Sequence, residues 1–302
     1  MEKIINIHIE KLPGEVYLAT SEDIPGLVAQ GRTATEALEM AREDARKLLE
    51  LEDRRSRFIA HNIALDDGTQ TRPDQESLLS QEPWVQSAKH LLRVLFPNGL
   101  NGVSIVDLGC LEGGYSVEFA RLGMNALGLE VREANFHKCR YVRDHLSLPN
   151  LRFEQDDVWN LERYGQFDVI FCCGLLYHLN APAKFIRLMS SLCTKAVIIN
   201  THFAPEEPSS AFSLSEIEEN EGLSGRWFWE HDGTAEQRDN WPEASWENRT
   251  SFWLRRPDLL SAIKSAGFPI VFEQFDMLGD IRESMTNGFY RQKHRSTFVG
   301  LK

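Results

Sequence analysis

Glycines and carboxylates gather in one short stretch of the chain in a pattern that suits a bound ligand. Glycine fills three of the six positions of residues 109–114, and Asp107, Glu112 and Glu130 lie in or near this stretch. Glycine lets the backbone come close to a ligand, and the first N–H groups of a helix that follows have no partner within that helix. Residues 109–114 are therefore the first candidate for a ligand-binding turn.

The turn lies between elements that would position it. Val103–Leu108 is a short apolar run, as expected of a strand buried on both faces of a parallel sheet. Apolar residues within 115–122 suit a helix packed on that sheet, which Gly123 ends. Asn125–Val131 is predicted to be a second strand. Its end carries an acid, Glu130, as in nucleotide-binding βαβ units, where the acid hydrogen-bonds the ribose.

The spacing of the glycines separates the versions of this unit. A dinucleotide site has the pattern G-x-G-x-x-G, whereas GCLEGG at 109–114 lacks the middle glycine and carries Glu112, which would repel a phosphate. Instead, DLGC at 107–110 resembles motif I of the class I S-adenosylmethionine-dependent methyltransferases, whose ligand carries an ammonium and a sulfonium. Leu111 departs from that family, where glycine is commoner. On this stretch alone, a phosphate-binding or empty βαβ domain is the alternative.

The resemblance implies which residues would bind S-adenosylmethionine. Glu130 would accept from the ribose hydroxyls, Asp157 would accept from the adenine amine, and the backbone N–H of Val158 would donate to the adenine ring. The implied set is Asp107, Gly109, Cys110, Gly113, Glu130, Val131, Asp157, Val158 and Gly174. The alternative for the adjacent acids Asp156 and Asp157 is that they cap a short helix at 159–164.

Two histidines are candidates for the group that takes a proton from the methyl acceptor. His178 lies in GLLYHL at 174–179, where the family's chain faces the acceptor, and imidazole accepts a proton near neutral pH. Many family members carry Tyr-His here, so the alternative role of His178 is to shape the pocket. His202 follows the strand predicted at 195–201, on the rim where such folds bind ligands. The sequence does not choose between them.

The remaining apolar runs predict a doubly wound α/β sheet. They alternate with helical segments and lie at 151–155, 167–173, 195–201, 270–276 and 296–301, with 277–295 as the loop between the last two. The resemblance covers about residues 57–302 and implies seven strands, the seventh antiparallel between the fifth and sixth. The expected fold is a Rossmann-like methyltransferase sheet with a small N-terminal α+β domain and a tryptophan-rich lid insertion.

The insertion at 204–253 interrupts this alternation. Residues 206–221 contain six glutamates and no basic residue, as expected of a solvated loop and helix, whereas 225–253 contains five of the seven tryptophans. A long stretch without regular structure inside a domain is usually functional. The tryptophans either line an acceptor pocket as a lid or fill a private core of the insertion.

The first 52 residues are predicted to be a separate α+β unit. Alternating apolar residues indicate a hairpin turning at 11–14, a third strand at 27–30 and an amphipathic helix capped by Thr33 and Glu36. Residues 19–51 resemble the HicB-type antitoxin domain. DNA binding is not expected, because residues 1–52 hold 6 basic and 11 acidic residues, and dimerisation or packing is the simpler role.

A polar junction at 53–80 follows, and the methyltransferase domain is expected at 81–302. Residues 61–69 resemble the lead-in of one subgroup of the family, in which this segment approaches the cofactor pocket. The alternative is a solvated connector.

Composition limits the partners. The chain has 33 basic and 45 acidic residues, a net charge of −12, so nucleic acid is an unfavoured partner. The five cysteines lie in predicted helices and strands without a C-x-x-C pair, which predicts reduced thiols in a cytoplasmic protein and no metal site. No apolar run is long enough to span a membrane.

The sequence thus predicts an S-adenosylmethionine-dependent methyltransferase acting on an oxygen or nitrogen nucleophile of a small organic acceptor. Residues 1–52 are the expected contact if the protein forms a homodimer. One alternative is methyl or carboxymethyl transfer to tRNA, since DLGCLEGG and GLLYHL also resemble the enzyme that carboxymethylates wobble uridine. Another is a non-catalytic protein that binds a cofactor or partner.

Overall fold

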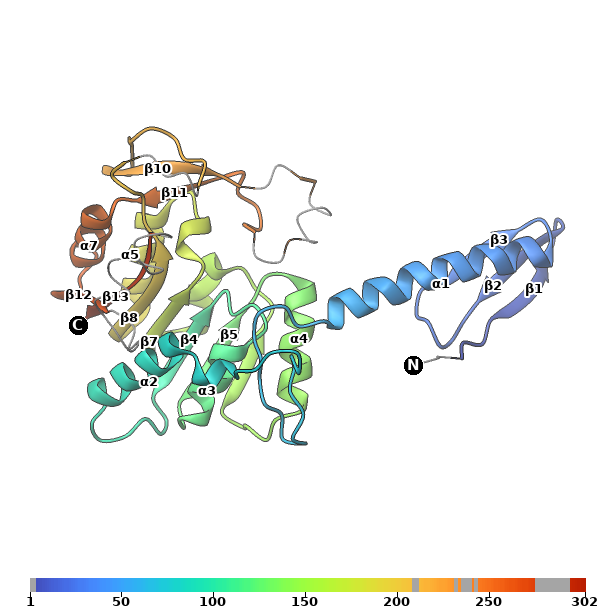
Figure 1. Cartoon of the computed structure of the whole chain (residues 1–302), viewed down its shortest axis with the longest axis horizontal. Helices are drawn as coiled ribbons and strands as arrows, with labels where there is room; N and C mark the ends of the chain where they lie inside the picture. The colour runs from blue at the N-terminus through green and yellow to red at the C-terminus, as the bar shows by residue number, and fades with distance from the viewer. Residues whose placement is uncertain (1–3, 208–211, 231–232, 235–240, 242–243, 275–293) are drawn as a thin grey trace. The chain divides into compact units, whose positions relative to one another are not determined.

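The computed structural model describes residues 4–207, 212–230, 233–234, 241, 244–274 and 294–302, with the backbone alone for residues 50–56. The chain divides into two compact units, Met1–Arg57 and Phe58–Lys302 (Figure 1). The predicted boundary at residue 52 falls inside a helix that continues to Ser56. The second unit therefore begins within the stretch that was expected to be a junction.

The first unit is a three-stranded antiparallel sheet with one helix packed on it. Its elements are β1 (His8–Leu12), β2 (Val16–Thr20), β3 (Val28–Gly31) and α1 (Ala34–Ser56). The helix begins with the predicted cap: Thr33 Oγ1 accepts from the N–H of Glu36 at 3.1 Å, and the Glu36 carboxylate accepts from the N–H of Arg32 at 2.7 Å.

Small residues bring this helix close to the sheet. Ala19 and Ala29 on the strands meet Ala37 and Ala41 on α1, and all four are buried. A Cβ at Gly31 would lie 2.4 Å from the backbone nitrogen of Ala37, so only glycine fits there. The first unit therefore has a core of its own.

The second unit is built on a seven-stranded sheet. Its strands, in the order in which they lie, are β12 (Ile270–Gln274), β13 (Arg295–Leu301), β8 (Cys193–His202), β7 (Phe167–Cys173), β4 (Ser104–Leu108), β5 (Asn125–Leu129) and β6 (Leu151–Glu154). Strands β4 to β8 pair in parallel, and β13 pairs antiparallel with both β8 and β12. This is the predicted arrangement of seven strands. The predicted loop between the last two lies largely outside the described residues.

Helices cover both faces of this sheet (Figure 1). One apolar cluster joins the sheet to α2 (Pro83–Leu95), α3 (Gly114–Arg121) and α4 (Glu133–Asp144). A second cluster joins the other face to α5 (Pro182–Leu192) and α7 (Arg256–Ser265). The central strands are consequently buried on both sides, which explains their unbroken apolar sequences.

The insertion carries regular structure, contrary to the expectation of a structureless stretch. Strands β9 (Glu218–Asn220), β10 (Leu223–Trp229) and β11 (Thr250–Leu254) form a second, antiparallel sheet in the order β11-β10-β9. Phe252 and Leu254 belong to the same apolar cluster as α5 and α7. The insertion is therefore packed onto the second unit through β11.

A buried carboxylate joins the start of the second unit to the glycine turn. Glu112 is fully buried, and its oxygens accept the backbone N–H groups of Ile59, Ala60 and His61 at 2.7 to 3.0 Å. Lys138 of α4 donates to the same carboxylate at 2.9 Å. Burial raises the pKa of Glu112, but Lys138 and the N–H groups outweigh burial and hold the pKa below its usual value. Three segments distant in the sequence thus meet at one charge.

Replacing Glu112 by glutamine should destabilise the protein strongly. The change leaves the Lys138 ammonium buried without its anion, which costs about 3–5 kcal/mol of the free energy of unfolding. Urea denaturation followed by circular dichroism measures this loss. Glu133→Gln, an exposed site on the same helix as Lys138, should change stability by less than about 0.5 kcal/mol. Equal losses in the two variants would contradict the role of Glu112.

Candidate functional site

The predicted ligand residues gather at one edge of the large sheet. Parallel strands β4, β5 and β7 end at Leu108, Leu129 and Cys173, and the predicted cofactor residues Gly109, Glu130 and Gly174 immediately follow them. Open α/β sheets bind ligands at the carboxyl ends of such strands. The topology therefore places the glycine turn, Glu130 and Gly174 at the edge where a ligand is expected.

The glycine turn adopts left-handed backbone conformations at three positions. Gly109 has φ +67° and Gly113 has φ +78°, and a Cβ on Gly113 would lie 2.5 Å from the ring of Phe153. Leu111 stands where the family commonly has glycine, and its φ is +54°. Its N–H donates to Glu130 at 2.9 Å. Leucine thus takes a glycine-like conformation that one hydrogen bond holds in place.

Asp107 and Glu130 are the buried acids of this edge. Asp107 is 2% exposed, accepts from Ser116 Oγ at 2.7 Å, and has a pKa that burial raises to about 7. Glu130 is 5% exposed and accepts N–H groups of Leu111 and Arg132, each at 2.9 Å. Burial raises its pKa, although these N–H groups oppose the rise. Each Glu130 oxygen keeps one lone pair for a ligand hydroxyl.

His61 caps the helix α3, which follows the glycine turn. It is 5% exposed, and its Nδ1 accepts the N–H of Gly114, the first residue of α3, at 3.1 Å. Burial lowers its pKa to about 4, so the imidazole is neutral at pH 7. Residues 58–65 are packed into the second unit. The solvated-connector alternative is therefore wrong for this stretch.

The two adjacent acids after β6 both stabilise local structure. Asp157 Oδ1 accepts the N–H of Trp159 at 2.9 Å and caps the 3-10 helix Val158–Tyr164. Asp156 accepts from the N–H of Asp157, from Asn160 Nδ2 and from the Tyr164 hydroxyl. Capping uses one oxygen of Asp157, so the cap and the predicted contact with adenine are compatible.

His178 is paired with a carboxylate that the sequence analysis did not single out. Its Nδ1 lies 2.9 Å from Oε1 of Glu230, a residue of the insertion that is 8% exposed. Glu230 also accepts from the hydroxyl of Ser251 and from the N–H of Ser245. The sequence offered one weak signal for Glu230, which is its position directly after an aromatic strand. This signal does not indicate His178, because the two residues lie 52 positions apart.

His202 sits in an aromatic cluster. Its ring stacks on Trp253 with centroids 4.8 Å apart and an interplanar angle of 11°, and it meets the edge of Tyr177 at 4.6 Å. Tyr177 also contacts His178 at 4.3 Å. The structure therefore brings Tyr177, His178 and His202 together, and a role of the two histidines at the acceptor stays a prediction.

The tryptophans of the insertion have several roles. Trp227 packs on Phe252 in the apolar cluster, whereas Trp229 is 63% exposed. Trp246 lies under the guanidinium of Arg132 at 5.0 Å. Neither alternative, lid or private core, describes all of them.

Arg132 ties the insertion to the acid that was predicted to bind ribose. Its guanidinium donates to the carbonyls of Ala244 at 2.7 Å and Ser245 at 3.2 Å, while its backbone N–H donates to Glu130. Arg132 is 4% exposed. The insertion is thus docked two residues from Glu130.

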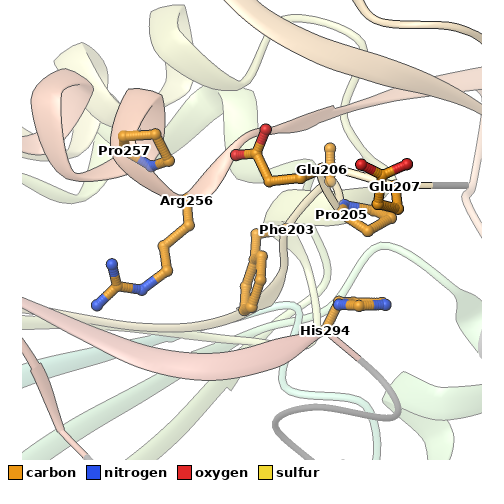
Figure 2. Close-up of a pocket in the computed structure, with 8 residues that line it drawn as sticks. Phe203, Pro205, Glu206, Glu207, Arg256, Pro257 and His294 are labelled. Carbon is orange, nitrogen blue, oxygen red and sulfur yellow. The ribbon is translucent and has the colours of Figure 1, made fainter. Parts of the chain in front are cut away.

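A pocket of about 430 Å³ lies elsewhere in the second unit (Figure 2). Phe203, Pro205, Glu206, Arg256 and His294 are among its lining residues. It contains none of the predicted cofactor residues and neither candidate base. The pocket therefore does not correspond to the predicted site.

The residues at the sheet edge fit S-adenosylmethionine. Its ammonium and hydroxyl groups are donors, and Asp107 and Glu130 are buried acceptors beside the turn. The amide of Asn135, in the first turn of α4, is 1% exposed and interacts with Glu130, whose pKa it helps to lower. A ligand bound near Glu130 would meet this second buried polar group.

Among the described residues, no cluster of His, Cys, Asp and Glu is arranged to hold a metal ion. None of the helices in that part of the chain combines the length and the apolar character needed to cross a membrane.

Among known protein families, the model described as a methyltransferase domain matches residues 100–244. This stretch, just under half of the chain, is thus similar to a methyltransferase domain. Every predicted cofactor residue, and both candidate bases, fall within the matched residues. The match agrees with the expectation of an enzyme of this class.

Curated relatives match a shorter stretch of the chain. Ubiquinone biosynthesis O-methyltransferase of Acinetobacter baylyi is 30% identical over 96 residues, which are 31% of this chain and 40% of that protein. The tRNA U34 carboxymethyltransferase of Campylobacter hominis is 33% identical over 94 residues, 30% of this chain and 33% of that protein. The chain thus matches about a third to two fifths of these relatives' lengths.

Solved structures confirm the fold. The N-terminal domain of EvdMO1, determined in the presence of SAH and D-fucose, superposes with a TM-score of 0.59 at 22% identity and covers 85% of this chain and 97% of that one. The same domain with SAH bound gives 0.59 at 23% identity, covering 86% and 96%. The predicted Rossmann-like methyltransferase fold is confirmed.

His61 should make stability depend on pH. Its folded pKa of about 4 lies below the unfolded value near 6.5, so the unfolded chain binds more protons between these values. Stability is full above the higher value and falls as the pH falls. Between pH of about 6.5 and about 5, wild type should lose about 1.6 kcal/mol more than His61→Gln. Urea denaturation at both pH values measures the difference, and the contribution of Asp107 cancels because both proteins contain it. Parallel losses would contradict the neutral, buried imidazole.

Proposed function

We propose that the protein is an S-adenosylmethionine-dependent methyltransferase that methylates a nucleophile of a small organic acceptor. The observation that carries this proposal is the edge at which the left-handed turn 109–113 meets two buried acids, Asp107 and Glu130. The family match over residues 100–244 supports it. So does the likeness in fold to a domain that binds SAH, the demethylated form of the cofactor.

The cofactor would be held by the residues that the sequence predicted. Glu130 would accept from the ribose hydroxyls with the lone pairs that Leu111 and Arg132 leave free, and Asp157 would accept from the adenine amine. The turn at Gly109, Cys110 and Gly113 and the chain at Gly174 would border the methionine part. When bound, S-adenosylmethionine supplies a methyl group that its sulfonium makes reactive, so the protein must align the acceptor and remove one proton.

The acceptor would lie at the rim of Tyr177, His178 and His202. An oxygen nucleophile is favoured because a relative that matches the domain is named an O-methyltransferase. The choice between the two histidines as base favours His178, since Glu230 holds its Nδ1 and leaves Nε2 to accept a proton. His202, stacked on Trp253, would shape the rim.

Transfer to tRNA is a second candidate, because a relative that matches this domain is a tRNA U34 carboxymethyltransferase. The net charge of −12 opposes it. Arg72, a basic residue near the start of the second unit, is used internally: its guanidinium donates to the carbonyl of Ile59 and lies 3.7 Å from Asp74. Retention on immobilised tRNA at physiological salt would favour this candidate.

The first unit would be an accessory module. Its strand order and helix are compatible with the HicB-like resemblance, and the role that fits it best is assembly of a homodimer, in the cytoplasm. Every residue assigned to the cofactor lies in the second unit.

Loss of either adenosine contact should weaken cofactor binding. Glu130→Gln and Asp157→Ala should each lower the affinity for S-adenosylhomocysteine at least about tenfold, or about 1.4 kcal/mol. Isothermal titration calorimetry measures the affinity. Glu133→Gln, exposed at the start of α4, is the matched control and should bind as wild type does. Asp157→Ser keeps an oxygen that can cap the helix, so it separates the loss of the helix cap from the loss of the contact with adenine. Wild-type affinity in both Glu130→Gln and Asp157→Ala would refute the assigned site.

Removing residues 1–57 should leave cofactor binding nearly unchanged. The remaining chain keeps all predicted cofactor residues and the Glu112 hydrogen bonds to residues 59–61. Calorimetry with S-adenosylhomocysteine should give an affinity within about threefold of wild type, which is about 0.65 kcal/mol, and light scattering should show a smaller assembly. Loss of binding in a folded truncated protein would contradict the division into two functional units.

A further inference from the structure

The insertion supplies a carboxylate to the segment after β7. Glu230 follows β10, whereas His178 ends the 3-10 helix Leu176–His178. Their side chains meet at 2.9 Å, with the His178 side chain 14% and the Glu230 side chain 3% exposed. The contact joins two segments 52 residues apart in the chain.

Glu230 is held on both of its oxygens. Oε1 accepts from His178 Nδ1 and the Ser251 hydroxyl, and Oε2 accepts the N–H of Ser245 at 3.3 Å. Burial raises the pKa of Glu230, but the hydrogen bonds from His178, Ser251 and Ser245 outweigh burial and hold it below its usual value. Glu230 is therefore an ionised acceptor at neutral pH, with no proton to donate to the imidazole.

The backbone of His178 is fixed by the same segment. Its carbonyl accepts from Ser245 Oγ at 3.1 Å and from Asn248 Nδ2 at 2.8 Å. Ser245 in turn accepts from Arg132, which follows Glu130. The insertion thus holds His178 by its ring and its backbone while it is docked beside the acid that would bind ribose.

This arrangement determines the tautomer of His178. An ionised carboxylate only accepts hydrogen bonds, so the Nδ1 that faces Glu230 carries the proton and Nε2 carries a lone pair. Free histidine favours the opposite tautomer. Only the tautomer with a lone pair on Nε2 allows that nitrogen to take a proton from an acceptor.

We propose that Glu230 is a positioning residue that keeps His178 in the tautomer able to deprotonate the methyl acceptor at Nε2. The inference rests on the proposed function. In the step, the acceptor proton moves to Nε2 and the acceptor's electron pair forms the bond to the methyl carbon. The electron pair of the broken S–C bond stays on sulfur, and Glu230 stabilises the imidazolium that results.

The other groups around this pair are consistent with the assignment. Tyr177, from the same 3-10 helix, contacts His178 at 4.3 Å, and Arg295 of β13 lies over the Tyr177 ring at 5.4 Å. His202 of β8 meets the other edge of Tyr177. Glu230 is the carboxylate that faces the imidazole within the described residues.

The proposal is tested by the tautomer itself. Long-range ¹H–¹⁵N NMR on the full-length, ligand-free protein at one neutral pH reports which ring nitrogen of each of the nine histidines carries a proton, and His178→Gln identifies the signals of His178. Wild type should show a protonated Nδ1 and an unprotonated Nε2. Glu230→Gln should move the proton of His178 to Nε2 in at least part of the population, because an amide can donate as well as accept.

A matched variant separates position from packing. Ser251→Ala removes a neighbour of Glu230 and keeps the carboxylate, so it should retain the wild-type tautomer. In wild type, a proton on Nε2, either alone or in an imidazolium, would overturn the proposal. An unchanged tautomer in Glu230→Gln would overturn it too.

The same samples distinguish this proposal from the proposed function. Glu230→Gln should bind S-adenosylhomocysteine within about threefold of wild type by calorimetry, since Glu230 is not among the cofactor residues. A normal tautomer with no binding in wild type rejects the cofactor site and not the histidine pair. Normal binding with the wrong tautomer rejects only the role of Glu230.

Discussion

A buried carboxylate, Glu112, holds the start of the second unit and helix α4 to the glycine turn. Glu112 lies in the glycine turn, and it binds the chain at residues 59–61 and Lys138 on α4. A charge buried this deeply is tolerated only when it is fully hydrogen-bonded and paired. The same hydrogen bonds that stabilise the charge of Glu112 also hold its partners in place. His61 is one of these partners, and it caps α3 as a result.

Glu230 makes an equivalent connection on the other side of the site. It binds His178, Ser245 and Ser251, so it joins the segment after β7 to the second half of the insertion. The sheet supplies a rigid edge, and two buried carboxylates attach irregular segments to that edge. Binding residues on loops that a rigid scaffold positions are a common solution, and here hydrogen bonds to buried carboxylates make the attachment.

Arg132 links the two halves of the site. Its N–H serves the Glu130 carboxylate, its guanidinium serves the carbonyls of Ala244 and Ser245, and Trp246 covers it. The regions that we propose for the cofactor and for the acceptor would therefore share one buried side chain. Geometry of this kind suits a transfer reaction, in which two reactants must be aligned to a fraction of an ångström.

The sequence alone determined the features that depend on local chemistry. Continuous apolar runs predicted the seven strands because strands covered on both faces exclude polar residues. The Thr33–Glu36 cap and the turn at 109–114 were also predictable, because capping oxygens and glycines act on backbone within a few residues. The sheet order followed from the resemblance to a family, and the structure agrees with it.

Tertiary structure decided the features that depend on partners distant in the chain. Glu112 suggested only repulsion of a phosphate, yet its partners at 59–61 and 138 make it a structural centre. Glu230 was not singled out, because nothing near it in sequence indicates His178. The sheet β9–β11 was missed since its short strands are completed by β10 pairing with β11, whose residues lie more than 20 positions apart. A buried charge or an unpaired strand finds its partner among residues that are close in space. Its neighbours in the sequence do not reveal which residues those are.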